Sequence, residues 1–209
     1  MNLEAIAGVA HPPTGRPAGA VVLTHGAGGD RDSEILVRVC DAWAQRGWLA
    51  IRYNLPYRRR RPKGPPSGTA ADLAGVEAAL AMAREAVDGP VIAGGHSYGG
   101  RLTSMAVAAG CEVLALTLFS YPLHPPGRPQ QQRTAHFATI SAPTVFTHGT
   151  SDPFGTTAEL RAAAALIPAP TEILEVTGAR HDLRSADRTG IAGVATRAVD
   201  ATLRLGGPG

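Results

Sequence analysis

The 209-residue sequence has few cysteines and no long apolar run, and each scarcity excludes a class of protein. Cys40 and Cys111 are its two cysteines, and neither lies in a Cys-x-x-Cys or zinc-ligand spacing. We therefore expect reduced packing cysteines, with no disulfide framework and no metal site. No apolar run approaches the roughly 18 residues of a membrane span. We therefore expect no membrane partner. A P-loop and a dinucleotide fingerprint are missing as well, so we expect no cofactor.

Targeting signals and charge are also scarce. The first residues lack the basic start and apolar core of a secretory signal, so we expect a cytoplasmic protein. Asp, Glu, Lys and Arg make up 18% of the chain and hydrophobic residues 44%, which is enough apolar material for one core. The length fits a single domain over residues 1–209.

The net charge of +3 comes from one short segment. Arg58 to Lys63 holds five of the 20 basic residues, which leaves 15 against 17 acidic ones in the rest of the chain. A nucleic-acid-binding surface spreads its positive charge over a face, so we expect no nucleic-acid partner. The segment follows a predicted strand. It is interpreted either as a basic loop near a site that attracts acidic substrates or as a solvated loop.

Short apolar runs alternate with amphipathic patterns along the chain. The runs predict strands at residues 20–24, 48–53, 90–93, 113–119, 144–147 and 171–176. Helical spacing predicts helices at about 32–46, 70–88, 98–109, 160–167 and 186–205. Alternating strands and helices form βαβ units, in which helices cover both faces of a mostly parallel sheet. We therefore predict a three-layer α/β/α architecture with a sheet of about six or seven strands.

Ligand sites of open parallel sheets lie beyond the carboxyl ends of the strands. Ser97, Asp152 and His181 follow three different predicted strands at that end. Ser97 lies in the segment GGHSYGG, which predicts a strained strand-to-helix turn. We expect side chains at Gly95 and Gly99 to collide there, and we expect Gly94 and Gly100 to be less constrained.

These three residue types suit nucleophilic catalysis. A serine hydroxyl is a weak nucleophile until a base takes its proton, and a histidine with a pKa near 6.5 can act as that base. Asp152 would orient the imidazole of His181 and stabilise its charged form. Alternatively, Asp152 caps the turn or helix that follows it. Asp182 is a weaker candidate because it is adjacent to His181.

A negative charge that develops on a substrate oxygen needs hydrogen-bond donors. We expect these from the backbone N–H groups of Ala27 and Tyr98, the second at the positive end of a helix. Gly28 and Gly29 would let the Ala27 loop approach closely. Of the other histidines, we expect His25 and His148 to brace loops, His96 to point away from Ser97, and His124 and His136 to lie in a proline-rich loop.

The segment GHSYG matches the G-x-S-x-G nucleophile elbow, and the chain order Ser, Asp, His resembles that of the α/β-hydrolases. The phrases HGAGGDRDS, NLPYRRRR, GGHSYGGR, YPLHPPGRP and HGTSDPFG resemble the small, lid-less, dienelactone-hydrolase-like branch of the testis-expressed protein 30 type. The resemblance covers the chain from about residue 20 to the final helix. It implies a three-layer α/β/α hydrolase fold without a cap domain. Dienelactone hydrolases carry cysteine where this chain has Ser97.

Residues 120–142 are too few and too rich in proline to form a helical cap, which predicts a shallow, open site. Arg101, Arg58 and Tyr121 are candidate substrate contacts near the strand ends. Arg101 lies in the first turn of the helix after Ser97, where a cation opposes the helix dipole. This placement indicates either an anionic ligand or a salt bridge to a neighbouring loop.

The function predicted from the sequence is a metal-independent serine hydrolase that cleaves an ester or related acyl bond through an acyl-enzyme. Its partner would be a small acyl substrate, with an anionic one as an option, and the protein would be a monomer or homodimer. Two alternatives stay open. One is a hydrolase-fold binding or scaffold module with a vestigial triad, and the other is an acyltransferase.

Overall fold

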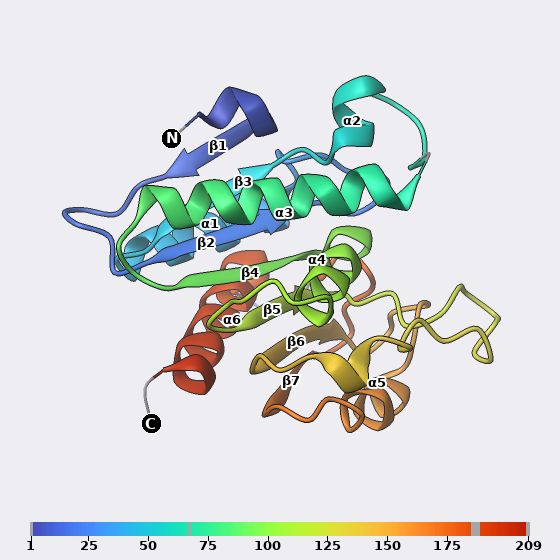
Figure 1. Ribbon diagram of the computed structural model, residues 1–209. Coiled ribbons are helices and arrows are strands. Elements are labelled where there is room, and N and C mark those ends of the chain that lie inside the picture. Colours follow the sequence, from blue (N-terminus) through green and yellow to red (C-terminus); the bar gives the residue numbers. More distant parts are fainter. Residues whose placement is uncertain (1, 67, 185–188, 208–209) are drawn as a thin grey trace.

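The computed structural model describes residues 2–66, 68–184 and 189–207, and these residues form one seven-stranded sheet (Figure 1). The strands are β1 (Gly8–His11), β2 (Ala20–Thr24), β3 (Leu49–Tyr53), β4 (Val91–His96), β5 (Leu116–Phe119), β6 (Thr144–Gly149) and β7 (Thr171–Val176). Their order is β1-β3-β2-β4-β5-β6-β7. β1 pairs antiparallel with β3, and all other neighbours are parallel.

Helices cover both faces of this sheet. The helices are α1 (Glu34–Gln45), α2 (Pro56–Arg60), α3 (Thr69–Ala86), α4 (Tyr98–Ala108), α5 (Thr157–Ala164) and α6 (Gly190–Gly206), with 3-10 turns at Leu3–Ile6 (η1) and Phe137–Thr139 (η2). α1 and α6 pack on one face, and α3, α4 and α5 supply the core of the other (Figure 1). The alternation of side chains along a strand divides β2 between the two cores. Ala20 and Val22 enter one core, whereas Val21 and Leu23 enter the other.

The predicted three-layer fold is confirmed, with two additions. β1 was not predicted, and residues Pro56–Arg60, which were interpreted as part of a loop, form the short helix α2. The predicted start of the last helix at residue 186 lies outside the described residues.

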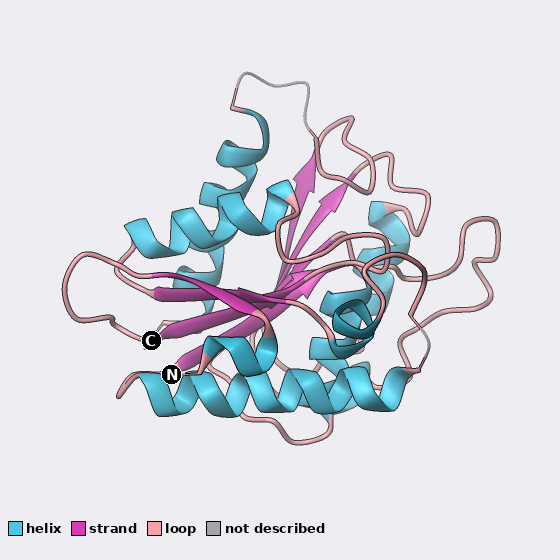
Figure 2. Cartoon of the chain, turned by 90° about the horizontal axis from the view of Figure 1, so that it is seen from above, coloured by secondary structure: helices cyan, strands magenta, loops and turns pink. Residues whose placement is uncertain are grey.

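The parallel strands β2 to β7 point toward the side of the molecule where the long loops gather (Figure 2). Between β5 and β6, the described chain contains η2 as its one helical segment, so no helical cap covers this end. None of the helices that the structure describes has the length and apolarity required to cross a bilayer.

Candidate active site

Ser97 occupies the turn between β4 and α4 in a conformation that few non-glycine residues adopt. Its φ is 51° and its ψ is −118°. A Cβ at Gly95 would lie 2.6 Å from the carbonyl oxygen of Thr24, and one at Gly99 would lie 2.6 Å from that of His25. The steric reason predicted for these two glycines is therefore confirmed. Strain of this kind persists only where the surrounding structure enforces it.

The expectation for Gly94 was wrong. Its Cβ would collide with the backbone carbonyl of Thr117 on the neighbouring strand β5. A Cβ at Gly100 would lie 2.7 Å from the carbonyl oxygen of Gly95, so this glycine is constrained as well. All four glycines around Ser97 are needed because backbone approaches on every side.

Ser97, His181 and Asp152 form one continuous hydrogen-bonded relay. Ser97 Oγ lies 2.7 Å from His181 Nε2, and His181 Nδ1 lies 2.8 Å from Asp152 Oδ2. A carboxylate only accepts hydrogen bonds, so Nδ1 carries the proton and Nε2 is free to accept from the Ser97 hydroxyl. The Asp152 side chain is fully buried, whereas 23% of the His181 side chain is exposed. In this arrangement the imidazole is placed to accept the proton of the Ser97 hydroxyl.

Asp152 also accepts a hydrogen bond from the backbone N–H of Phe154, at 2.9 Å. The two interpretations of Asp152 are therefore compatible, because one carboxylate both holds the turn and contacts the imidazole. Asp182 is exposed and accepts from the backbone N–H of Arg184. It takes no part in the relay.

Two side chains that were not predicted to do so fix the position of His181. The ring of Phe154 lies over the imidazole, with 4.3 Å between centroids. His96 Nε2 lies 2.8 Å from the carbonyl oxygen of His181. Burial lowers the pKa of His96 to about 4, so His96 is neutral near pH 7 and donates this hydrogen bond from its Nε2–H. His96 was expected to point away from Ser97, and its ring lies beside that of His181, with 5.2 Å between the ring centroids.

The backbone amides of Ala27 and Tyr98 have no hydrogen-bond acceptor among the described residues, as donors to a substrate oxygen require. The close approach comes from a glycine other than those predicted. A Cβ at Gly26 would lie 3.0 Å from His96 Nδ1 and 3.2 Å from Ser97 Cβ, whereas one at Gly28 would meet open space. The predicted reason for Gly28 was therefore wrong, and Gly26 is the residue that brings the loop to Ser97.

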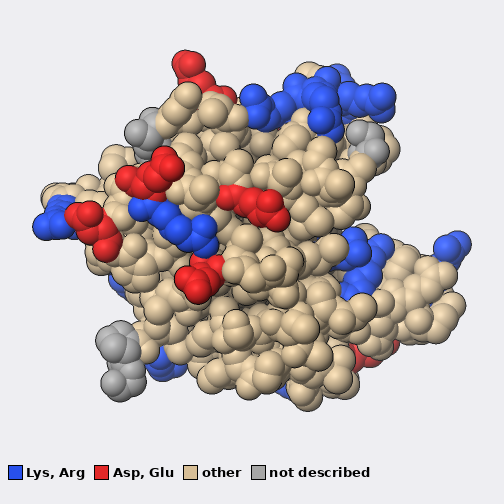
Figure 3. Space-filling view, in the orientation of Figure 1, with Lys and Arg blue, Asp and Glu red and all other residues tan. Residues whose placement is uncertain are grey.

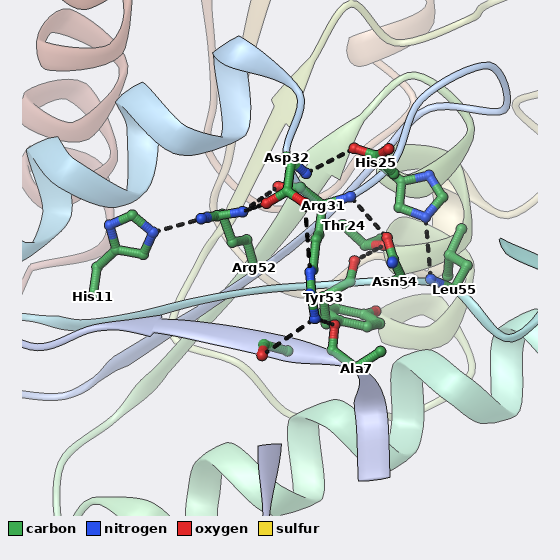
Figure 4. A network of polar contacts seen from close by, with 12 residues as sticks. Ala7, His11, Thr24, His25, Arg31, Asp32, Arg52, Tyr53, Asn54 and Leu55 are labelled. Atoms are coloured by element: carbon green, nitrogen blue, oxygen red, sulfur yellow. Dashed lines mark hydrogen bonds and ion pairs between the residues drawn. The ribbon is translucent and has the colours of Figure 1, made fainter. Parts of the chain in front are cut away.

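The loop after β2, residues 25–33, is anchored at both ends by the polar network of Figure 4. His25 Nε2 accepts from the backbone N–H of Leu55 at 3.2 Å. The backbone N–H of Arg31 donates to Asn54 Oδ1 at 2.8 Å, and Arg52 binds the carbonyl oxygen of Arg31 and the carboxylate of Asp32. Leu55, Asn54 and Arg52 lie in or just after β3, so neighbouring strands fix the loop. The expected bracing role of His25 is seen here.

Arg58 stabilises the middle of the same loop. Its Nη2 donates to the carbonyl oxygen of Ala27 at 3.0 Å, its Nε to that of Gly29 at 2.8 Å, and its Nη1 to that of Pro62 at 2.9 Å. The residue is 7% exposed. The interpretation of Arg58 as part of a solvated loop was therefore wrong. Its donors are occupied by protein carbonyls, so the structure does not present it as a substrate contact.

Tyr57 and Asp72 also hold the loop that contains Ala27. The Tyr57 hydroxyl donates to the carbonyl oxygen of Ala27 at 2.8 Å. The buried Asp72 carboxylate accepts from the Tyr57 backbone N–H at 2.9 Å and from the Tyr98 hydroxyl at 3.1 Å. Burial and the Asp72 charge raise the pKa of Tyr98 to about 12, so its hydroxyl stays protonated and donates. The Asp72 carboxylate thus connects Tyr98, at the start of α4, with Tyr57, which holds the Ala27 loop.

The structure does not bring Tyr121 to the site. Its side chain is buried among Phe137 and Phe146, and its hydroxyl donates to the carbonyl oxygen of Arg133 at 2.7 Å. The prediction of Tyr121 as a substrate contact is not supported by this position. Arg101 lies in the first turn of α4, as predicted, and forms no ion pair with a described carboxylate.

Ser97 and His181 open onto a cavity of about 410 Å³. Its apolar wall includes Ile35, Phe154 and Ile191. The exposed residues Glu34 and Arg184 also line the cavity, with Arg184 Nη2 3.2 Å from Glu34 Oε2. No sequence signal identified these residues, apart from the position of Phe154 after a predicted strand. Within the described part of the chain, no group of three or more His, Cys, Asp or Glu side chains is arranged to hold a metal ion.

Comparison with known proteins identifies the family of this chain and proteins of similar fold. Residues 17–203 match the family model described as an alpha/beta hydrolase domain. Among solved structures, the dienelactone hydrolase from Anabaena variabilis is 20% identical, with a TM-score of 0.69 over 94% of this chain and 90% of that one. XC6422 from Xanthomonas campestris, described as a serine hydrolase without lid, is 14% identical, with a TM-score of 0.72 over 94% and 87%. Est1E from Butyrivibrio proteoclasticus with bound ferulic acid is 13% identical, with a TM-score of 0.75 over 95% and 94%.

Proposed function

Because the chain belongs to the alpha/beta hydrolase domain family, we propose that it is a serine hydrolase that cleaves an ester or related acyl bond through Ser97, His181 and Asp152. The observation that carries the proposal is the relay of 2.7 and 2.8 Å contacts that joins these three side chains at the carboxyl end of the sheet. An inert serine in a tight turn needs neither a histidine acceptor nor a buried carboxylate behind that histidine.

In the proposed reaction, Ser97 Oγ attacks the acyl carbonyl while His181 Nε2 takes its proton. Asp152 keeps the imidazole in the required tautomer and stabilises its charged form. The amides of Ala27 and Tyr98 bind the oxyanion, and each such donor is worth about 3 kcal/mol. His181 then returns the proton to the leaving alcohol. Water then attacks the acyl carbon while His181 takes its proton, and His181 returns that proton to Ser97 Oγ as the acid leaves.

Arg58 and Tyr57 act in this proposal as positioning residues. The Tyr57 hydroxyl contacts the carbonyl oxygen of Gly26 at 3.3 Å, and this carbonyl shares a rigid peptide plane with the Ala27 N–H. Both Tyr57 and Arg58 bind the carbonyl oxygen of Ala27, which restrains the next peptide plane, so the two residues together fix the orientation of Ala27. Donors that aim at the oxyanion before reaction need no reorganisation during it. Arg58 therefore serves the reaction through Ala27 and not through the substrate.

Several finer assignments are part of the proposal. Within the family, we place the chain in the dienelactone-hydrolase-like branch of the testis-expressed protein 30 type. The open end of the sheet and a cavity of about 410 Å³ favour short or exposed acyl groups. We further propose a cytoplasmic monomer or homodimer that has no nucleic-acid partner.

The proposal is tested with 4-nitrophenyl butyrate and a fluorophosphonate probe. We expect turnover and covalent labelling by the wild type, and a loss of at least about 1,000-fold in kcat with no labelling for Ser97→Ala. Ser151→Ala, at an exposed serine in the turn before Asp152, is the matched control and keeps both activities.

Failure of the wild type to turn over any acyl ester or to take the label would favour the alternative of a vestigial triad in a binding module. Transfer of the butyryl group to an added alcohol in preference to water would favour the acyltransferase. Retention of activity by Ser97→Ala would refute the assignment of the nucleophile.

A further inference from the structure

The cavity at Ser97 shares part of its wall with a second cavity. Glu34, Arg184 and Ile191 line both the cavity of about 410 Å³ at Ser97 and a neighbouring one of about 340 Å³. We call this second space the outer cavity, and its described lining also includes Gly190. The three shared residues form the wall between the two spaces, and the proposed chemistry uses none of them.

This wall has one part that is fixed in the core and one part that is free to move. Ile191, near the start of α6, is buried in the same apolar core as Ile35. Glu34 and Arg184 form an ion pair in which their side chains are 50% and 71% exposed. An exposed ion pair contributes little to stability, because water weakens the attraction and two long side chains lose rotamer freedom. The Glu34–Arg184 pair can therefore open while the core around Ile191 stays intact.

The ion pair joins two segments that carry groups of the proposed reaction. Glu34 is the first residue of α1 and follows the loop that contains Ala27. Arg184 lies three residues after His181, and its backbone N–H donates to Asp182 Oδ1 at 3.2 Å. Asp182 is also a second charged partner, with its Oδ2 4.0 Å from Arg184 Nε. The pair thus bridges α1 and the loop of His181 at the border of the cavity.

The pair is separate from the basic segment of the chain. Figure 3 shows Lys and Arg side chains gathered over α2. Glu34 and Arg184 lie instead at the start of α1 and after β7, and the outer cavity reaches the first residues of α6. Helices α1 and α6 share one core on the same face of the sheet. The function of this pair is therefore considered without the charge of α2.

The walls of the cavity at Ser97 suit the acyl part of a substrate. Ile35, Phe154 and Ile191 place apolar surface beside Ser97. In the proposed reaction, water takes the place of the departed alcohol, so the alcohol side has to be open to solvent. The acyl chain stays on Ser97 through both halves of the reaction, and each methylene that it buries stabilises its complex. We therefore assign the apolar wall to the acyl chain.

We propose that the Glu34–Arg184 ion pair limits the length of the acyl chain, and that the outer cavity is a second acyl subsite for unbranched chains of medium length, such as octanoyl. The inference rests on the proposed function. A short chain such as butyryl binds while the pair is closed. A longer chain displaces the pair and enters the outer cavity, where Ile191 offers apolar contact on both sides of the opening. The pair thereby determines which acyl chains are accepted.

The test compares 4-nitrophenyl octanoate with 4-nitrophenyl butyrate, which differ only in the length of the acyl chain. Each methylene that leaves water strengthens binding by up to about fourfold. We expect Arg184→Ala and Glu34→Ala each to raise the octanoate-to-butyrate ratio of kcat/KM on the order of 10-fold above the wild type, because part of the longer chain then enters the outer cavity. Arg204→Ala, which breaks an exposed ion pair with Glu172 in the last turn of α6, keeps the wild-type ratio.

A charge swap separates the effect of the ion pair from that of side-chain size. Glu34→Arg/Arg184→Glu keeps one charge of each sign at the wall, and we expect it to restore most of the wild-type ratio. A swap that behaves like the two Ala variants overturns the inference.

An octanoate-to-butyrate ratio that stays at the wild-type value in both Ala variants overturns the inference and leaves the proposed function standing. A change that appears only in the alcohol chain, measured with octyl and butyl acetate, overturns it as well. A second measurement does not depend on turnover. In calorimetric titrations, methyl octanoate binds Ser97→Ala/Arg184→Ala about 10-fold more tightly than Ser97→Ala, and equal binding overturns the inference. Hydrolysis of neither 4-nitrophenyl ester by the wild type contradicts the proposed function, and the titration then decides the acyl subsite alone.

Discussion

Replacement of Arg58 by methionine tests whether the support of the Ala27 loop is needed for activity. Methionine has an apolar side chain of similar length to the arginine stem. The change removes the three N–H donors to the carbonyl oxygens of Ala27, Gly29 and Pro62. Hydrogen bonds from a charged donor contribute about 1.5–3 kcal/mol each, but water can reach part of the vacated surface. We therefore expect the free energy of unfolding to fall by about 2–4 kcal/mol.

The effect on catalysis follows from the position of Ala27. Loss of a whole oxyanion donor costs about 100- to 1,000-fold in kcat, and Tyr57 still binds the Ala27 carbonyl oxygen in the variant. A displaced donor is a smaller defect, so we expect kcat to fall on the order of 10- to 100-fold while KM changes little. The assays are steady-state hydrolysis of 4-nitrophenyl butyrate and urea unfolding.

Arg59 is the matched control. It is the next residue of α2, exposed, and its guanidinium binds the carbonyl oxygen of Ala5, away from the site. Arg59→Met should leave kcat within about twofold of the wild type. Equal losses for the two variants, or an unchanged kcat in Arg58→Met, would refute the assignment of Arg58 as a positioning residue.

Three further predictions follow from the site and its frame. Asp152→Asn should lower kcat on the order of 10,000-fold with little change in KM, measured with the same ester, because the amide favours the wrong imidazole tautomer. Burial holds the pKa of His96 at about 4, below about 6.5 in the unfolded chain, so only the unfolded state gains this proton as the pH falls between those values. The free energy of unfolding should then fall by up to about 3 kcal/mol from pH 7 to pH 4, and His96→Gln should remove that part in urea titrations. Gly94→Ala should destabilise by about 3 kcal/mol or more because its Cβ meets the Thr117 carbonyl, whereas Gly28→Ala, in open space, should unfold at the wild-type urea midpoint.

The parts of the fold that are predictable from the sequence are those with local periodicity. The buried parallel strands read as apolar runs, and the helices α1 and α3 show the spacing of one buried face. The site was predicted for a related reason. In a parallel sheet the carboxyl ends of the strands meet at one edge, so Ser97, Asp152 and His181 converge although they are distant in sequence.

What was not predicted depends on partners distant in sequence. β1 is a four-residue strand without buried residues, and its pairing with β3 comes from register across some 40 residues. Arg58 belongs to a run of four arginines, which is typical of a solvated segment. Its burial arises because the loop after β2 presents the carbonyl oxygens of Ala27 and Gly29 to its guanidinium. The local sequence pattern of neither α2 nor the loop after β2 indicates this contact, because it depends on how the two segments meet in the fold.

The order of the strands has a consequence for how the chain becomes active. Ser97 Oγ and His181 Nε2 are joined across 84 residues, and His181 follows β7, the edge strand of the sheet and the last in the chain. Parallel pairing requires each crossover to close first, so such contacts form late in folding. A refolding or newly made chain therefore holds an unactivated serine until β6 and β7 have joined the sheet. The rate at which a fluorophosphonate labels Ser97 after dilution from denaturant would report the final step of folding.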